Sequence, residues 1–495
     1  MNRLVVYFKV LLLVISANHV ATSKCTCFRT EEYVTCTTKE PRPRFNANVA
    51  FANMNAAQKL MSNTIPFDKI TSLRIQCLIK SIQLDSFKNQ HPMKNLDLSQ
   101  NFIETFPNQM FQSLPFLETL NISRNELKNP TLDTFAALSN LTVLDASHNS
   151  FMVINLGVLD DMEKLQELYV NDNKISFLPG GVFDLLVNLR KLDLSNNKLT
   201  VVKYNIFEYT TSLQEVNLSG NDLSGVEALV GLDSLNLVID LDLSNCNIEQ
   251  LPPSVFSRLT KLQRLNLNFN VIKTLTTVFN GAEHLLTLHM AHNRLHSIPG
   301  HLFDNNLKLE EVDWSYNQLK TLPDELFRKT EYFKYMNLSH NMITDLPIKI
   351  FQWTGLAEID LSHNQFTTLE PELLNMETLE RVHAQHNKIA FLEDAAFSSC
   401  TFPVRYIDLK YNRLVYLQEY FFDWLANLER LEIFGNPFDC TCFHDLIKLL
   451  TNRFIKYDAE NYNTSKAICA VGENSVCQYY NTNLTYFYEM FKHIV

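Results

Sequence analysis

Glycine is scarce in this chain, with 11 residues among 495. Loops that cradle phosphates and turns that bind dinucleotides need clustered glycines, and the sequence contains neither a G-x-x-x-x-G-K nor a G-x-G-x-x-G pattern. It also lacks the G-x-S-x-G motif of serine hydrolases and the H-E-x-x-H motif of zinc peptidases. We therefore expect a protein that is not an enzyme and that holds no cofactor.

Two kinds of run are also missing. The formal net charge is −11 and no long basic run occurs, so no nucleic-acid partner is expected. After residue 23 no stretch of about 18 apolar residues follows, so no transmembrane segment is expected. Residues 1–23 have the features of a secretory signal peptide, with Arg3, the apolar stretch Leu4 to Ile15 and a small-residue site at Ala21-Thr22-Ser23. An uncleaved anchor is the alternative; cleavage would deliver the protein to the extracellular space or matrix.

An asparagine, in contrast, recurs every 23 to 25 residues along most of the chain. The positions are Asn101, Asn125, Asn149, Asn173, Asn197, Asn221, Asn270, Asn293, Asn317, Asn341, Asn364, Asn387, Asn412 and Asn436, and Cys246 fills the one vacant place. Each asparagine stands in the frame L-x-x-L-x-L-x-x-N-x-L, as in Leu189 to Leu199. That frame at that period is typical of a leucine-rich repeat solenoid. We predict an α/β solenoid, a curved horseshoe with a parallel concave β-sheet and about 16 repeats, including a degenerate first unit around Cys77.

The frame assigns a structural role to most of its residues. Alternate strand residues face opposite sides, so the leucines point into the core and the residue between them points to the concave face. The asparagine amides are predicted to form a structural ladder that satisfies buried backbone groups at the turn, with Cys246 as a weak donor. Ten residues after the asparagine a phenylalanine recurs, which predicts an aromatic spine on the convex side: Phe111, Phe135, Phe183, Phe207, Phe256, Phe303, Phe327, Phe351, Phe397 and Phe422.

Cysteines gather at the two ends of the repeat array. Cys25, Cys27 and Cys36 precede it, and Cys440, Cys442, Cys469 and Cys477 follow it. In a secreted chain this distribution predicts disulfide caps over the exposed ends of the core, and a zinc site is the alternative. We predict an N-terminal cap over residues 24–69, repeats over 70–437, and a C-terminal cap and tail over 438–495.

The stretch from Asn436 to Cys442 resembles the C-terminal cysteine cap of animal extracellular leucine-rich repeat proteins. The resemblance implies disulfides Cys440–Cys469 and Cys442–Cys477, although four cysteines alone allow three pairings. The start resembles part of their N-terminal cap but lacks its first cysteine. One thiol of that end therefore needs another partner, for which Cys77 is the first candidate and Cys400 the alternative.

The full frame, as at Leu165 to Phe183, resembles Toll-receptor ectodomains, Slit-like guidance proteins and secreted insect immune proteins. These relatives imply recognition in innate immunity or a receptor accessory. An extracellular-matrix or adhesion component and a secreted antagonist or inhibitor are the alternatives. The partner would be an extracellular protein or glycan bound on the concave face, and homo-oligomerisation stays open.

Six N-x-[ST] sequons predict glycosylation, at Asn121, Asn140, Asn217, Asn337, Asn463 and Asn483. Asn121, Asn217 and Asn337 fall on the strand position between the two leucines, and we call these three the strand sequons. A glycan there would mask part of the concave face.

The candidate binding surface is a row of rings predicted to stand on successive strands, directly before the ladder asparagines. We call it the ring row; its members are Phe269, His292, Tyr316, His340, His363, His386 and Tyr411. His289 and His383 lie in the neighbouring concave column. Rings at strand spacing would make an amphipathic strip on the concave side, and clustered histidines could make binding sensitive to mild acid. Duplication of the repeat, with no ligand, is the alternative, and we expect no metal site because the histidines form a row without a closed ligand set.

Overall fold

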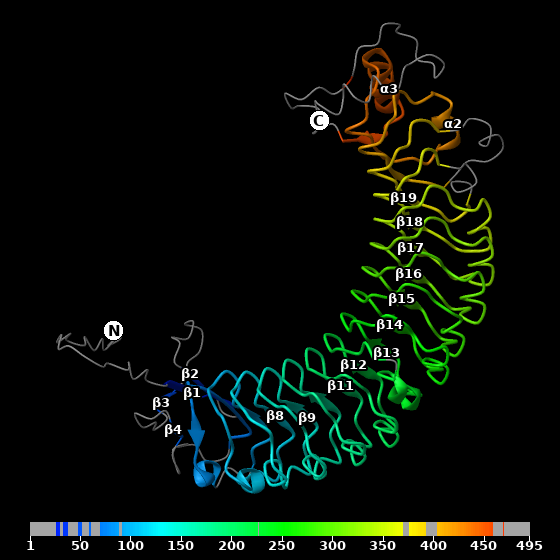
Figure 1. Cartoon of the computed structure of the whole chain (residues 1–495). Helices are drawn as coiled ribbons and strands as arrows, with labels where there is room; N and C mark the ends of the chain where they lie inside the picture. The colour runs from blue at the N-terminus through cyan, green and yellow to red at the C-terminus, as the bar shows by residue number, and fades with distance from the viewer. Residues whose placement is uncertain are drawn as a thin grey trace, which may run out of the picture.

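The computed structural model describes residues 26–29, 33–37, 48–51, 59–60, 70–88, 92–225, 227–369, 376–392, 403–458 and 469. These residues wind into an open horseshoe whose turns stack from the N-terminal to the C-terminal end (Figure 1). The predicted solenoid is therefore confirmed: one parallel sheet runs through the whole array, with little helix.

Sixteen short strands, one per repeat, form the body of the sheet, and each pairs in parallel with the strand of the next repeat. They are β5 (Ser72–Gln76), β7 (Asn95–Asp97), β8 (Thr119–Asn121), β9 (Val143–Asp145), β10 (Glu167–Tyr169), β11 (Lys191–Asp193), β12 (Glu215–Asn217), β13 (Asp240–Asp242), β14 (Arg264–Asn266), β15 (Thr287–His289), β16 (Glu311–Asp313), β17 (Tyr335–Asn337), β18 (Glu358–Asp360), β19 (Arg381–His383), β20 (Tyr406–Asp408) and β21 (Arg430–Glu432).

The ends extend this sheet. Strands β1 (Thr26–Arg29), β2 (Tyr33–Thr37) and β3 (Asn48–Phe51) form an antiparallel set that joins β5 through β2, and β22 (Lys456–Tyr457) pairs with β21. A second sheet joins β4 (Lys59–Leu60) to β6 (Ser81–Ile82). Among the described residues, the helices are the 3-10 turns η1 (Leu84–Phe87), η2 (Met110–Ser113) and η3 (Val230–Ser234), and the α-helices α2 (Phe421–Trp424) and α3 (Cys440–Asn452).

The asparagine ladder lies at the turn that follows each strand, and Asn341 shows its geometry. Its Nδ2 donates to the carbonyls of Trp314 (2.9 Å) and Leu338 (3.0 Å), and its Oδ1 accepts from the N–H of Leu319 (3.0 Å). One amide thus satisfies groups of two successive repeats, as buried backbone polar groups require. All the predicted ladder asparagines are buried.

Cys246 fills its place in the ladder differently. Its Sγ donates to the carbonyls of Leu218 and Ser244, each at 3.3 Å. A thiol offers no strong acceptor, and the N–H of Leu223 bonds instead to the backbone carbonyl of Cys246 at 2.9 Å. Burial raises the pKa of this thiol to about 12, so it stays protonated and acts as a donor.

The phenylalanine spine is also present in the described residues. Successive rings stack with centroids 5.4–6.4 Å apart. This spacing exceeds the ~4.8 Å between strands, so the spine lies on the outer side of the curve. Phe279 stacks between Phe256 and Phe303 although it is one place out of the predicted register, and Phe397 lies outside the described residues.

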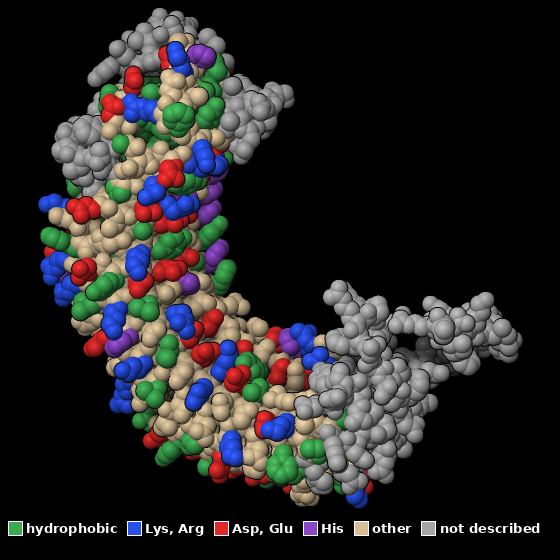
Figure 2. Space-filling view, turned by 180° about the vertical axis from the view of Figure 1, so that it is seen from behind, with side chains coloured by type: hydrophobic (Ala, Val, Ile, Leu, Met, Phe, Trp, Pro, Cys, Tyr) green, Lys and Arg blue, Asp and Glu red, His purple; other side chains and the backbone are tan. Residues whose placement is uncertain are grey.

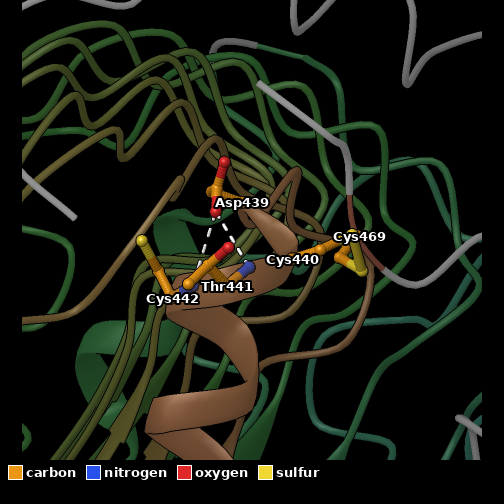
Figure 3. Close-up of a disulfide and its surroundings, with 5 residues drawn as sticks. All are labelled: Asp439, Cys440, Thr441, Cys442 and Cys469. Atoms are coloured by element: carbon orange, nitrogen blue, oxygen red, sulfur yellow. Dashed lines mark hydrogen bonds between the residues drawn. A yellow bond between two sulfur atoms is a disulfide. The ribbon is translucent and has the colours of Figure 1, made fainter. Parts of the chain in front are cut away.

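At the C-terminal end α3 closes the core (Figure 3). The carboxylate of Asp439 caps this helix by accepting from the N–H groups of Thr441 (2.9 Å) and Cys442 (3.4 Å). Cys440 is joined to Cys469, the pair that the resemblance implies, and Cys442 is also disulfide-bonded.

At the N-terminal end Cys36 and Cys77 are both disulfide-bonded. The side chains of Cys25 and Cys27, together with Cys400 and Cys477, lie outside the described residues.

Candidate functional site

The residue before each ladder position has a left-handed backbone in fifteen successive repeats, from Gln100 to Gly435. The non-glycine members have φ between 51° and 58°. Each from Gln100 to Tyr411 donates its N–H to the next repeat, as His340 does to the carbonyl of Ser362 at 2.9 Å. The backbone therefore fixes these residues at one per turn, in a column just beyond the ends of the strands. We call this the left-handed column; its second half carries the ring row.

The seven rings of the ring row form one continuous stack. Neighbouring centroids are 3.9–4.4 Å apart and neighbouring planes differ by 10–14°. The six steps span about 25 Å. The structure thus brings together every member that the sequence placed in the row.

The position of the row differs in one respect from the prediction. The rings do not stand on the strands but follow them, at the edge where the sheet turns away. Their spacing is below the ~4.8 Å between strands, so they lie on the inner side of the curve. Histidine side chains line the inner margin of the C-terminal arm (Figure 2). The physical reason is the left-handed turn, which ends the strand before the ring.

Each internal ring is covered on both faces, so the row presents mainly ring edges to solvent. Phe269, Tyr316 and Tyr411 are nevertheless 57%, 44% and 38% exposed. At the C-terminal end Tyr411 lies against Gly435, where a Cβ would come within 2.5 Å of the ring, and Phe434 meets Tyr411 edge-on. A glycine therefore ends the stack.

Aromatic side chains are not what this backbone favours. A left-handed residue is normally glycine, asparagine or aspartate, and others cost about 1–2 kcal/mol. The first half of the column includes such residues at Asp172, Asn196 and Gly220, beside Gln100, Arg124 and His148. Stacking returns about 0.5–1.5 kcal/mol per pair, which offsets part of the cost. Histidine is itself enriched at positive φ, but Phe269, Tyr316 and Tyr411 go against the local backbone preference, which favours a role at the surface over simple duplication.

Burial and neighbouring charge act on two histidines of the row. The pKa of His340 lies below its usual value because the ring is partly buried and because His363 and His292 are close, while Asp360 opposes the shift. The pKa of His386 is lowered by burial and by His363 and His340, again against an opposing carboxylate, Asp408. Both rings are therefore mainly neutral at neutral pH.

His289 and His383 lie on strands β15 and β19 and do not join the stack. Each Nε2 lies 3.0 Å from a carboxylate on a neighbouring strand, Glu311 for His289 and Glu358 for His383. Between these two pairs stands Tyr335 on β17. Burial and the carboxylates Asp360, Glu358, Asp313 and Glu311 raise its pKa to about 12.

Sequence reasoning did not single out this half-buried tyrosine. The signal was a strand tyrosine in one repeat with acidic residues at the matching positions of both adjacent repeats.

The strand sequons share one local geometry. The Oδ1 of Asn121 accepts from the N–H (2.9 Å) and the hydroxyl (2.7 Å) of Ser123, and Asn217 makes the same two bonds with Ser219. Asn337 accepts from the N–H of Ser339 at 3.0 Å. Within the described part of the chain, the Nδ2 of each strand sequon makes no hydrogen bond.

Asn140 differs, because its Nδ2 donates to the carbonyl of Pro115 at 2.9 Å and its Oδ1 accepts from Lys164 at 2.7 Å. Asn463 and Asn483 lie outside the described residues.

Metal clusters and membrane-spanning helices are absent from the described residues. No group of three histidine, cysteine, aspartate or glutamate side chains there could hold a metal ion. No helix there has the length and apolar character needed to cross a bilayer.

Family models match the chain in two blocks. The model described as leucine rich repeat matches residues 69–127, 117–175, 163–223, 187–240, 238–295 and 283–343, together more than half of the chain. The model described as BspA type leucine rich repeat region (6 copies) matches residues 344–451. No protein with a curated description matches the sequence.

Several solved structures share the fold. A leucine-rich repeat protein of Leptospira interrogans is 27% identical, with a TM-score of 0.67 over 77% of this chain and 93% of that chain. A chain of the Toll–Spätzle complex of Drosophila in its glycosylated form is 20% identical, with a TM-score of 0.58 over 83% of this chain and 56% of that chain. In a second structure of the same complex the identity is 16% and the TM-score 0.67, over 94% of this chain and 73% of that chain. At these identities the Toll structures are similar in fold alone.

Proposed function

The chain belongs to the leucine-rich repeat family, and from that premise we propose that it is a secreted recognition protein that binds an extracellular protein through its inner side. The ring row is the observation that carries the proposal. Exposed rings at the edge of a concave sheet provide large contact area, and aromatic side chains dominate the energetics of many interfaces. The fold shared with the Toll chain of a complex described as a hub in development and innate immunity favours immune recognition as the setting.

Two features support secretion and glycosylation. The disulfide Cys440–Cys469 suits an oxidising compartment, because such bonds are rare in reducing ones. The strand sequons keep their structural hydrogen bonds on Oδ1, so a glycan on Nδ2 would break none of them. Such glycans would stand on β8, β12 and β17 and leave the strands between them available for a partner.

The test replaces rings without disturbing the backbone. Asparagine suits a left-handed residue, so the triple variant His340→Asn, His363→Asn and His386→Asn should fold while losing the centre of the row. The matched control makes the same change in the first half of the left-handed column, at Gln100, Arg124 and His148.

Partners would be captured from extracellular fluid with the wild-type protein, identified by mass spectrometry, and measured again as pure proteins. We expect the ring variant to bind at least tenfold more weakly, a loss of about 1.4 kcal/mol, and the control to bind as wild type. Equal affinity of the ring variant and wild type at pH 7.5 would exclude the row as the binding surface. Retention of the wild-type protein in insoluble matrix, with no soluble partner, would instead support an adhesion role.

A further inference from the structure

We propose that the ring row is an acid-sensitive switch, which stays stacked while its histidines are neutral and opens when three consecutive ones, His340, His363 and His386, become charged together. The switch is a property of the chain itself. Only its consequence, loss of the binding surface in mild acid, rests on the proposed function.

The three rings are close and their backbones are fixed. Centroids of His340 and His363 are 3.9 Å apart, and those of His363 and His386 are 4.2 Å apart. The N–H groups of His340 and His363 donate to Ser362 and Gln385 of the next repeat, each at 2.9 Å. The rings therefore cannot separate by sliding of the repeats, and rotation about the side-chain bonds is the way to relieve repulsion.

Repulsion and stacking are of comparable size at this spacing. Two unit charges about 4 Å apart repel in water about as strongly as one stacked ring pair attracts, and they repel more strongly where water is partly excluded. A single charged imidazole between neutral rings experiences no such repulsion. His363 has a histidine on each face. When all three histidines are charged, two repulsive contacts therefore oppose the stacking of the rings.

Charged groups beside the row affect how readily its histidines are protonated. Asp360 acts on His340 and Asp408 acts on His386, and both carboxylates favour the protonated ring. Lys410 and the remaining histidines oppose it, with His292 acting on His340. The outer two histidines of the three thus have an anion nearby that can receive them once they leave the stack.

The row should therefore titrate as a coupled set. The positive charge of His363 lowers the pKa of both His340 and His386, so these two rings resist protonation beside it. Protons on His340 and His386 then place adjacent charges on both faces of His363 and open the stack. Phe269 and Tyr316 do not become cationic, so the N-terminal end of the row, where His292 alone lies between them, stays stacked.

The test follows the imidazole signals by NMR in the full-length protein labelled with ¹³C at histidine Cε1, from pH 8 to pH 4.5. We expect His340 and His386 to titrate below the usual range of a histidine, and the contacts of their ring protons with those of His363 to disappear at the acid end. In His363→Phe, which keeps a ring but removes the charge, the pKa values of His340 and His386 should rise and the stack should persist at pH 5. His148→Phe, outside the row, is the control and should change neither.

Unchanged titration of His340 and His386 in His363→Phe, or a wild-type stack that remains intact at pH 4.5, would overturn the switch. These measurements need no partner. A switch that fails while the asparagine variant still loses binding would leave the proposed function standing, and the reverse result would leave the switch standing.

Discussion

Asn341 offers a quantitative test of how the ladder stabilises the array. Replacement by alanine removes the Oδ1 that accepts from the buried N–H of Leu319 and leaves that N–H without a partner. It also removes one donor from the carbonyls of Trp314 and Leu338. Each carbonyl keeps another donor, because Asn317 donates to Trp314 and Asn364 donates to Leu338. One orphaned donor costs about 1–3 kcal/mol and each lost bond about 0.5–1.5 kcal/mol. We therefore expect Asn341→Ala to cost about 2–6 kcal/mol.

Cysteine at the same position should cost less, for a reason visible in the native chain. At Cys246 a thiol donates to two carbonyls, and a backbone carbonyl takes over the N–H that an asparagine would bind. Asn341→Cys should therefore cost about 1–3 kcal/mol, because the hydrogen bonds of the amide are replaced by the weaker bonds of a thiol and are not lost outright.

Hydrogen exchange at the amide of Leu319 reports the effect locally, and urea unfolding reports it over the array. A cost of 2–6 kcal/mol corresponds to exchange that is roughly 30-fold to 20,000-fold faster. An exchange rate in Asn341→Ala within tenfold of wild type would refute the reasoning, as would equal costs for the alanine and cysteine variants.

Three further outcomes are expected. The pKa values of His340 and His386 are lowered in the folded state, so the unfolded chain takes up protons first as pH falls through about 6.5, and the free energy of unfolding should fall on acidification. Urea unfolding at pH 7.5 and pH 5 measures this fall. Replacing both histidines by phenylalanine should make the fall smaller. Gly435→Ala puts a Cβ against the ring of Tyr411 at a φ of +78° and should cost about 1–3 kcal/mol by thermal unfolding, whereas Gly300→Ala, whose Cβ would make only an ordinary 3.6 Å contact with Pro323, should be nearly neutral. Aspartate at each strand sequon should remove one glycan from the protein's mass on a denaturing gel without lowering the unfolding midpoint, because aspartates make the same turn in neighbouring repeats; a large drop in midpoint would contradict that equivalence.

The fold was readable from the sequence because the repeat frame repeats a backbone requirement. Asn341 must satisfy groups of two turns, so its period reports the period of the solenoid. The phenylalanine spine was predictable for the same reason. The exception is Phe279, which stacks between Phe256 and Phe303 although it lies one residue out of the predicted register. The predicted boundaries at residues 23, 69 and 437 remain predictions.

The candidate site was only partly readable. The members of the ring row follow from the register, but their place beyond the strand depends on a left-handed φ that a leucine–asparagine frame does not reveal. Asp172, Asn196 and Gly220 at equivalent positions carried that signal, since these residue types favour positive φ. Tyr335 was missed because its surroundings come from two other repeats, and no pattern within its own repeat marks it.

The unequal spacing of the inner and outer ring columns has a mechanical consequence. Rings of the inner column already touch at 3.9–4.4 Å, which is van der Waals contact, so the C-terminal arm cannot bend further inward. Nothing comparable opposes outward bending at the inner column, where straightening only lengthens contacts. The stacked rings therefore set the tightest curvature that the C-terminal arm can adopt, and they do not resist its straightening.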